Sequence, residues 1–149
     1  LRVIMAELTC QFVRPDRLLY EGNVASLILA TIDGELGVWP GHEPEIVALG
    51  DGVVRLSINQ PNGEVSIQKV VISGGYAEID PSGVIILADH ARRSDDIDAD
   101  VVRETRDAAI DKMNDFDEKD NRRTYYENKI KWCNLLLKQV LEDSGRTAK

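Results

Sequence analysis

The pattern of apolar residues changes near residue 90, and this change constrains the fold more than any other feature. Before it, short segments rich in β-branched residues are separated by glycine and proline roughly every eight to twelve residues, whereas after it apolar residues recur at helical spacing. No helix-length segment separates the predicted strands, so a parallel sheet with crossover helices is not expected. We predict an N-terminal antiparallel β domain, a sandwich or a barrel, over residues 1–90 and a C-terminal two-helix antiparallel hairpin over residues 91–149.

The N-terminal strands are predicted from runs of β-branched and aliphatic residues. The clearest hairpin signal is Asn62-Gly63, because both central residues of a type I′ turn need positive φ. Gly34, Gly37 and Gly41 are spaced like the turn glycines of one loop. The predicted strands are residues 10–13, 24–30, 53–58, 65–72, 76–79 and 84–88.

Two amphipathic helices are predicted in the C-terminal part. Asp96 or Asp98 can cap the first, because a carboxylate accepts from free N–H groups at the positive end of a helix. Residues 114–121 form a polar break, and Ser144-Gly145 is expected to end the second helix. The predicted apolar stripes are Val101, Val102, Ala108, Ala109, Met113 and Phe116 in the first helix, and Tyr126, Ile130, Cys133, Leu137, Val140 and Leu141 in the second, with Trp132 and Leu136 beside it.

The composition excludes several classes of protein. The 149 residues are 43% hydrophobic, which is enough for a core, and no apolar run approaches the roughly 18 residues that cross a bilayer. The formal net charge of −8 argues against a nucleic-acid binder and against unaided binding to anionic lipid. The start of the chain lacks the features of a secretory signal, and we expect Met5 to be the natural first residue.

The cations are concentrated in the helical part. Residues 1–90 carry five Lys or Arg against twelve Asp or Glu, while residues 91–149 carry thirteen against fourteen. One interpretation is a solvated helix face with ion pairs, and the other is a surface for an acidic protein partner. The cations of the second helix are Arg122, Arg123, Lys129, Lys131 and Lys138.

No catalytic or metal-binding set is identifiable. Cys10 and Cys133 lie far apart, and with only His42 and His90 the chain lacks the closely spaced ligands of a zinc site. We expect two reduced, buried thiols, a surface or capping role for His90, and a structural role for His42. Standard phosphate-binding loops and the GxSxG motif are missing, and the crowded carboxylates of residues 95–100 are interpreted as helix caps, so we expect no cofactor.

Four blocks of sequence resemble the epsilon subunit of bacterial F-type ATP synthase. They keep the order and spacing of that family across most of residues 5–100, and the glycine-rich second block is the most specific. The helical part matches in architecture and only loosely in sequence. The blocks are residues 14–22 (RPDRLLYEG), 33–44 (DGELGVWPGHEP), 72–79 (ISGGYAEI) and 86–89 (ILAD), the last leading to 95–98 (DDID).

The resemblance implies a ten-stranded β-sandwich and a non-catalytic role in the rotating central stalk, which couples proton translocation to ATP synthesis. In this family the sandwich docks on the gamma subunit and rests on the membrane ring of c subunits. The helices either fold on the sandwich or extend toward the catalytic beta subunits and inhibit ATP hydrolysis. Membrane association is then peripheral, through the complex, at the cytoplasmic face of the bacterial plasma membrane.

The resemblance also implies roles for particular residues. The segment with Glu35, Gly37, Gly41 and His42 is expected to face the c ring. The second-helix cations would favour the extended site, because the beta subunits present an acidic loop there. The residues expected at this contact are Arg122, Arg123, Lys129 and Lys131.

One nucleotide-binding motif of the family is altered. Some members bind ATP through an IDxxRA motif, of which this chain keeps Ile97 and Asp98, while Val101 and Val102 replace the arginine and the alanine. Valine supplies no donor to a phosphate. We therefore expect weak or absent ATP binding; the remaining cations at this place are Arg92 and Arg93.

Two other classes of function remain as alternatives. A free-standing β-sandwich binding module with a helical dimerisation tail fits the composition equally well, and it predicts a stable homodimer without affinity for a gamma subunit. An enzyme fits least, because no set of acid, base and nucleophile is identifiable.

Overall fold

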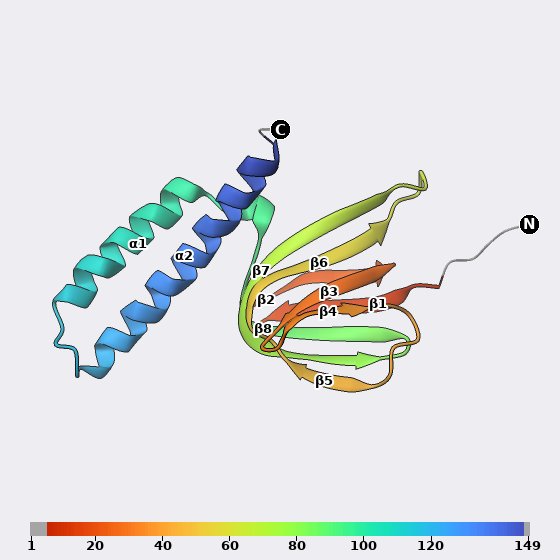
Figure 1. The fold of residues 1–149 in the computed structure, drawn as a ribbon, viewed down its shortest axis with the longest axis horizontal. Helices are drawn as coiled ribbons and strands as arrows, with labels where there is room; N and C mark the ends of the chain where they lie inside the picture. The colour runs from red at the N-terminus through yellow and green to blue at the C-terminus, as the bar shows by residue number, and fades with distance from the viewer. Residues whose placement is uncertain (1–5, 148–149) are drawn as a thin grey trace, which may run out of the picture. The chain divides into compact units, whose positions relative to one another are not determined.

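The computed structural model describes residues 6–147, and the chain divides into two compact units between Arg93 and Ser94 (Figure 1). The sequence predicted this change at residue 90. It lies three residues later because the last strand, β8 (Gly83–Arg93), continues through His90, which pairs with Ser73 of the neighbouring strand. The predicted start at Met5 lies outside the described residues.

The N-terminal unit is a β-sandwich whose strands follow the hydrogen-bonded order β2-β1-β8-β7-β6-β3-β4, with β5 paired to β7. All pairings among the described strands are antiparallel except that of β1 with β8, which is parallel. Most of the domain lies between β1 and β8 in sequence, so this pair needs no crossover helix. The strands before β8 are β1 Leu8–Arg14, β2 Arg17–Val24, β3 Ser26–Thr31, β4 Gly34–Val38, β5 Glu45–Ala48, β6 Asp51–Asn59 and β7 Val65–Asp80.

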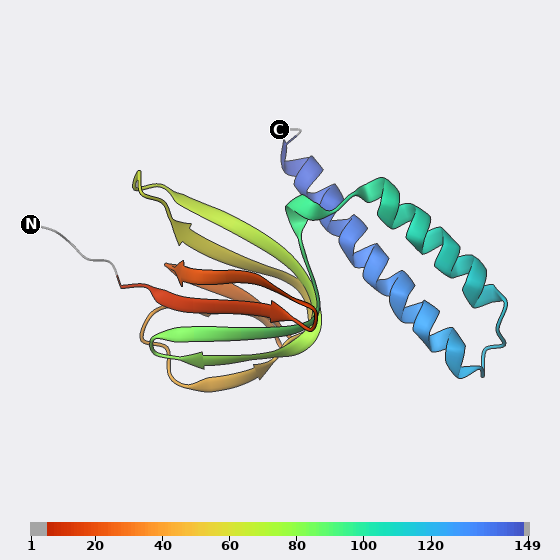
Figure 2. The same cartoon turned by 180° about the vertical axis from the view of Figure 1, so that it is seen from behind.

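Strands β7 and β8 pass through both layers of the sandwich, and Figure 2 shows them bending at one corner. The first half of β7 pairs with β6 and its second half with β5, while β8 follows β7 along both halves. Layer A is therefore β4, β3, β6 and the adjoining halves of β7 and β8; layer B is β5, the other halves, β1 and β2. Counting each half as a strand gives ten, the number that the family resemblance implied.

Two consecutive glycines make the bend possible. Gly74 and Gly75 have φ of 76° and 114°, values that other residues rarely adopt. A Cβ on Gly75 would lie 2.1 Å from Leu87 O, so the backbone of β8 also needs the space that a side chain would fill. The two predicted strands 65–72 and 76–79 are therefore the halves of one continuous strand, β7.

The core lies between the two layers and follows the alternation of the strands. In β1, Leu8, Cys10 and Phe12 are buried, whereas Thr9 and Gln11 are exposed. Phe12 is the largest side chain that is fully buried. Burial of Cys10, and of Cys133 in the helical unit, confirms the expectation of two buried thiols, and neither belongs to a disulfide.

The C-terminal unit is an antiparallel pair of helices, α1 (Ala99–Asn114) and α2 (Asn121–Thr147), preceded by one 3₁₀ turn, Ser94–Asp96. Asp98 is the N-cap of α1, as predicted, since its Oδ1 accepts from the N–H groups of Asp100 (3.1 Å) and Val101 (3.3 Å). The predicted end at Ser144-Gly145 is wrong. One glycine costs a helix only about 1 kcal/mol, which does not end it without a stop signal beyond.

The buried stripe of the hairpin differs in part from the predicted one. Cys133 and Leu136 of α2 are buried, with Val102 and Ala109 of α1, whereas Leu141 is 72% exposed and Val101 54% exposed. Leu136 thus belongs to the stripe itself, which continues at Gln139. The amide Nε2 of Gln139 donates to Asp143 Oδ1 at 2.9 Å, which satisfies this polar residue inside the stripe.

Three strands of the sandwich, β2, β4 and β5, are absent from the sequence prediction. The predicted strand 24–30 is divided at Ala25, so that Val24 ends β2 and Ser26 begins β3. Strand β4 lies in the segment that was predicted to be a loop. Only one of its five residues is buried, so its sequence has little of the apolar alternation of a strand. Both β2 and β4 lie at the ends of the strand order, where exposed and polar residues weaken the period-2 pattern.

Candidate partner-binding surfaces

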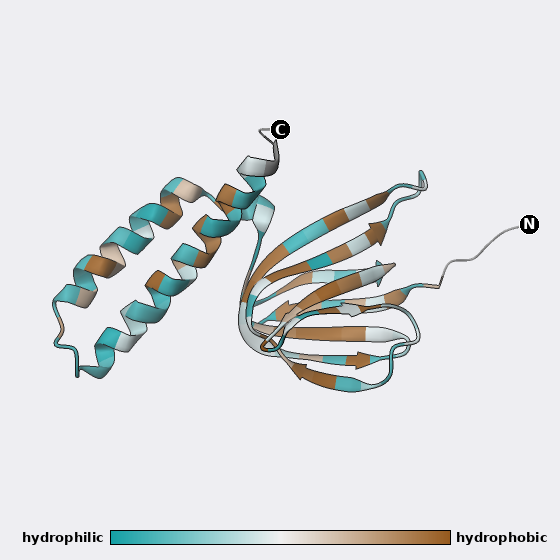
Figure 3. Cartoon of the chain, viewed as in Figure 1, coloured by the Kyte–Doolittle hydropathy of each residue, from teal (hydrophilic) through white to brown (hydrophobic). Residues whose placement is uncertain are grey.

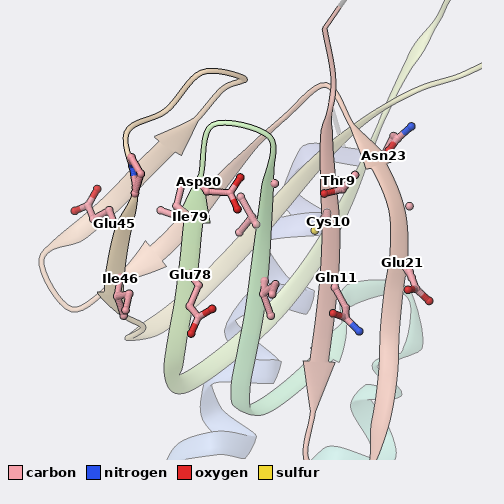
Figure 4. A pocket seen from close by; sticks show the side chains of 15 residues that line it. Thr9, Cys10, Gln11, Glu21, Asn23, Glu45, Ile46, Glu78, Ile79 and Asp80 are labelled. Carbon is pink, nitrogen blue, oxygen red and sulfur yellow. The ribbon is translucent and has the colours of Figure 1, made fainter.

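The outward face of layer B carries a groove of about 840 Å³ that crosses five strands (Figure 4). The strand register places Glu21, Gln11, Ile85, Glu78 and Ile46 in one row across β2, β1, β8, β7 and β5. All five are exposed, because the buried residues of these strands point to the other side.

Apolar side chains are unusually exposed on this face of layer B. Ile46 is 73% exposed, Leu18 47%, Tyr76 45% and Ile85 39%. The register also aligns Leu18 with Val13 and Tyr76 with Leu87, so the apolar residues form a second row beside the first. A gathering of exposed apolar side chains on a single sheet face is typical of a protein-binding surface.

The close pairing of β8 with β1 depends on one glycine of the groove. A Cβ on Gly83 would lie 2.4 Å from Thr9 Oγ1. Glycine at this position therefore lets β1 and β8 approach each other.

The segment expected to face the c ring is a strand with a turn at each end, rather than one loop. Strand β4 pairs antiparallel with β3, with Gly34 opposite Thr31 and Val38 opposite Leu27. Glu35 therefore lies near the β3–β4 turn and His42 lies past the opposite end of β4. Among the described interactions none joins these two residues.

Glu35 and Gly37 lie on the outward face of layer A. Glu35 Oε1 accepts from Arg55 Nη1 at 3.2 Å, and both side chains are partly exposed. Gly37 has ordinary backbone geometry, and its requirement for glycine comes from Trp39, whose ring would lie 2.3 Å from a Cβ. Trp39 covers the strand and is itself 59% exposed.

His42 belongs to a compact loop between β4 and β5. Gly41, with φ of 91°, donates its N–H to Pro81 O at 2.8 Å and ties the loop to the β7–β8 turn. Nδ1–H of His42 donates to Glu43 O at 2.7 Å, and Nε2 lies 3.9 Å from Oε2 of Glu45. These contacts give His42 the structural role that the sequence suggested.

Arg122 and Arg123 both hold the link between the helices together. Arg122 lies 4.6 Å from the ring centroid of Phe116, and its Nη2 donates to Asp120 Oδ2 at 2.8 Å. The hydrogen bonds and charge of Arg122 lower the pKa of Asp120, whose Oδ1 also accepts from the backbone N–H of Arg122 at 2.9 Å. The Arg122 side chain nevertheless remains 72% exposed.

The side chain of Arg123 is more buried than that of Arg122. Its Nη1 donates to Met113 O (3.2 Å) and Phe116 O (2.9 Å), and its side chain is 21% exposed. Met113 O lies in the last turn of α1 and also accepts from the N–H of Phe116 at 3.1 Å, and Phe116 O lies in the link that follows. Arg123 of α2 therefore ties the end of α1 to the link. Lys129 lies 5.9 Å from the ring centroid of Tyr125, and Lys131 is exposed.

The four residues considered for ATP binding are divided between the two units. Arg93 ends β8 and donates from Nη2 to Leu19 O, which fastens β8 to β2. Arg92 pairs with Val71 in the β7–β8 ladder. Ile97 precedes α1, and the carboxylate of Asp98 is occupied as the N-cap.

The described part of the chain was also searched for a reactive cysteine, a metal site and a membrane-spanning helix. Burial raises the pKa of the Cys10 thiol to about 12, so this cysteine is protonated and unreactive at neutral pH. Within residues 6–147 no group of His, Cys, Asp and Glu is placed to hold a metal ion. In the same range no helix has the length and apolar character of a membrane span.

Comparison with known proteins gives a consistent result. Residues 7–94 match the family described as ATP synthase, Delta/Epsilon chain, beta-sandwich domain. The ATP synthase epsilon chain of Moorella thermoacetica is 40% identical over 105 residues, covering 70% of this chain and 75% of the relative. That of Alkalihalophilus pseudofirmus is 36% identical over 110 residues, covering 74% and 79%.

Solved structures extend the similarity over the helices. A chain of the Euglena gracilis mitochondrial ATP synthase, in a cryo-EM structure of OSCP, F1 and the c-ring, aligns with a TM-score of 0.66 at 25% identity and covers 91% of this chain and 82% of that one. A chain of the Tetrahymena thermophila central stalk and c-ring aligns with a TM-score of 0.51 at 14% identity, which supports the fold alone.

Proposed function

The chain belongs to the ATP synthase delta/epsilon family, and from this premise we propose that it is the epsilon subunit of the central stalk, a non-catalytic rotor subunit that also restrains ATP hydrolysis. Its sandwich would dock on the gamma subunit and rest on the c ring. Its helices would contact the catalytic beta subunits when they extend. The subunit would then lie at the cytoplasmic face of the bacterial plasma membrane, held there only through the complex.

The observation that carries the docking proposal is the exposed apolar face of layer B. Leu18, Ile46, Tyr76 and Ile85 lie outside the buried core between the layers and keep 39–73% of their surface exposed. Their burial by a partner would contribute to a stable interface. We assign this face to the gamma subunit.

The two ends of β4 then have different partners. The loop with Gly41 and His42 leads directly into Pro44 and Glu45, which line the groove, so we assign this end to the gamma contact. The β3–β4 turn and Glu35 remain for the c ring. This proposal divides the set that the family resemblance assigned to the ring as a whole.

The inhibitory role is supported by the weak internal packing of the hairpin. Apolar side chains of both helices remain exposed, including Val101, Tyr125 and Leu141 at 54%, 62% and 72%. A helix pair with such surplus apolar surface gains free energy from burial at a second place. Two burial sites of similar free energy make a switch.

The cations of α2 remain candidates for contact with an acidic partner. Substitutions at these cations differ in how clearly they test that contact. Reversing the charge at Arg123 would release the end of α1 and unfold the link, so loss of inhibition would have two causes. Arg122→Gln and Lys129→Glu, made singly, should relieve inhibition, because each removes a cation and neither removes the carbonyl contacts that Arg123 provides. Unchanged inhibition in both variants would remove these residues from the contact.

ATP binding by this chain should be weak or absent. The carboxylate of Asp98 caps α1, and the guanidinium of Arg93 donates to Leu19 O. Val101 has no donor for a phosphate. Calorimetry with ATP on the full chain tests this proposal. A micromolar dissociation constant would contradict it.

The main experiment combines assembly with activity. The full chain should co-purify with the gamma-containing catalytic head, and its addition should lower ATP hydrolysis. A chain ending at Arg93 should still co-purify and should no longer inhibit. A full chain that ignores the catalytic head and forms a stable homodimer would instead favour the binding-module alternative.

A further inference from the structure

The groove on layer B is acidic as well as apolar. Four carboxylates line it, those of Glu21, Glu45, Glu78 and Asp80, and its lining contains no lysine, arginine or histidine. In the register, Glu21 and Glu78 alternate with Ile85 and Ile46 in one row. Figure 4 shows these acidic side chains distributed across the groove rather than gathered at one edge.

No cationic side chain among the lining residues neutralises the carboxylates of this groove. The backbone N–H and hydroxyl of Ser82 donate to Asp80 Oδ1 at 2.8 and 2.9 Å, and these bonds lower the pKa of Asp80. Among the described interactions, neither Glu21 nor Glu78 pairs with a cation. A partner that covers the apolar residues must therefore also meet these carboxylates.

We propose that the groove binds a cationic amphipathic helix of the gamma subunit, with lysine or arginine side chains opposite Glu21 and Glu78 and aliphatic side chains against Ile85 and Ile46. This inference rests on the proposed function and adds the chemistry of the partner segment. Carboxylates left uncovered at a buried interface are costly, whereas paired ones fix the position of the partner and speed its association.

The geometry of the sheet favours a helix over a strand. The groove lies on a sheet face whose backbone groups are already paired, and an added strand would instead need a free sheet edge. Glu21 and Glu78 are three strand spacings apart, about 14 Å. Cations about seven to eleven residues apart on one helix face span about 10 to 17 Å, which brackets this separation.

A second copy of this chain is a poorer occupant. In a two-fold dimer the same patch would face itself, so that each carboxylate row would lie against its own copy. Like charges brought together at an interface oppose association. A positively charged partner has no such conflict.

The test compares Glu21→Gln/Glu78→Gln with a matched control, Glu64→Gln/Glu104→Gln. All four glutamates are exposed, and Glu64 and Glu104 lie outside the groove. Asp80 stays unchanged because it holds the β7–β8 turn. Each full-length variant is bound to a gamma-containing catalytic head stripped of its epsilon subunit, at low and at high salt.

The groove variant should bind about three- to tenfold more weakly at low salt, mainly through slower association, and the difference should shrink at high salt. The control should stay within about twofold of the unmodified chain. If the unmodified chain binds and the groove variant matches it at both salt concentrations, the cationic helix is overturned while docking stands. If the unmodified chain does not bind, the proposed function fails with it, and a homodimer disrupted by the groove variant would place a second copy in the groove.

Discussion

The sandwich and the hairpin differ in how much of their apolar surface they bury internally. The core of the sandwich draws buried side chains from every strand except β5, and Phe12, Leu29, Leu56 and Ile86 are fully buried in it. In the described part of the hairpin, the buried apolar side chains are Val102, Ala109, Cys133 and Leu136. Figure 3 shows the contrast, with hydrophobic colour along the strands and mostly hydrophilic colour along the helices.

This difference indicates that the sandwich is the more stable unit and the hairpin the less stable one. The sandwich is stabilised by pairings between residues far apart in sequence, so it unfolds as a unit. The hairpin depends on local caps and one narrow stripe, so its stability is low and sensitive to its surroundings.

The largest effect is expected from truncating the core of the sandwich. Phe12→Ala should lower the free energy of unfolding by about 3–5 kcal/mol, because a cavity replaces a fully buried ring. Leu136→Ala, at a site 1% exposed, should cost about 2–3 kcal/mol and reduce only the helical signal. Urea unfolding followed by circular dichroism, at wavelengths where the helix and strand signals differ, distinguishes them. Loss of the sandwich in Leu136→Ala would contradict the independence of the two units.

The bend of β7 and β8 should tolerate no side chain. Gly75→Ala should cost about 3 kcal/mol or more, because the methyl group meets Leu87 O and the backbone has positive φ. Gly63→Ala has similar φ with nothing within 4 Å, so it should cost only about 1–2 kcal/mol. The two values come from denaturant unfolding, and equal losses would refute the role of close approach.

The two cysteines report directly on local opening. Cys133 should react with a thiol reagent about a hundredfold faster than Cys10, because opening the hairpin is easier than unfolding the sandwich. Mass spectrometry of native protein gives both rates. Single substitutions, Cys10→Ala and Cys133→Ala, assign each signal, and equal rates would mean that the chain opens as one unit.

A smaller effect is expected at the link between the helices. Arg123→Gln should lower the stability of the hairpin by about 1–2 kcal/mol, since the carbonyls of Met113 and Phe116 lose a charged donor. Arg122→Gln should cost less, because its side chain is 72% exposed. Thermal melting of the helical signal compares them. A reversed order would show that the pairing of Arg122 with Asp120 matters more.

The smallest effect is a pH dependence that belongs to the same link. The pKa of Asp120 is lowered from 3.8 by Arg122, so its contribution to stability is complete above that value and is lost as the pH falls through the folded pKa. Asp120→Asn should therefore flatten the acid side of hairpin melting between about pH 5 and 3. Glu118→Gln, in the same link, is the control and should leave this slope unchanged.

Local signals in the sequence predicted the type of each region and several details. Asn62-Gly63 marks the observed β6–β7 hairpin, and Gly63 has φ of 87°. Asp96 or Asp98 was predicted as a cap because a carboxylate accepts from free N–H groups at the positive end of a helix, and the structure shows Asp98 in that role. The number of strand segments, ten, was implied by the family resemblance. The apolar pattern alone predicted only six strands.

The missed features depend on contacts between distant residues. Gly37 is required by the ring of Trp39, which spacing does not reveal. The separation of Glu35 from His42 follows only from the pairing of β4 with β3, and the role of Arg123 in tying α1 to the link only from the packing of α2 on α1. The acidic row of the groove likewise appears only when five strands are aligned.

The continuity of β8 also has a mechanical consequence. The helical unit begins immediately after Arg93, the last residue of a strand that is bonded to β7 in both layers and to β1. A pull on the helices is transmitted along the axis of β8, whereas its hydrogen bonds run across that axis. The load is therefore shared as shear over many bonds at once rather than opening them singly, which suits an anchor that must withstand repeated torsion.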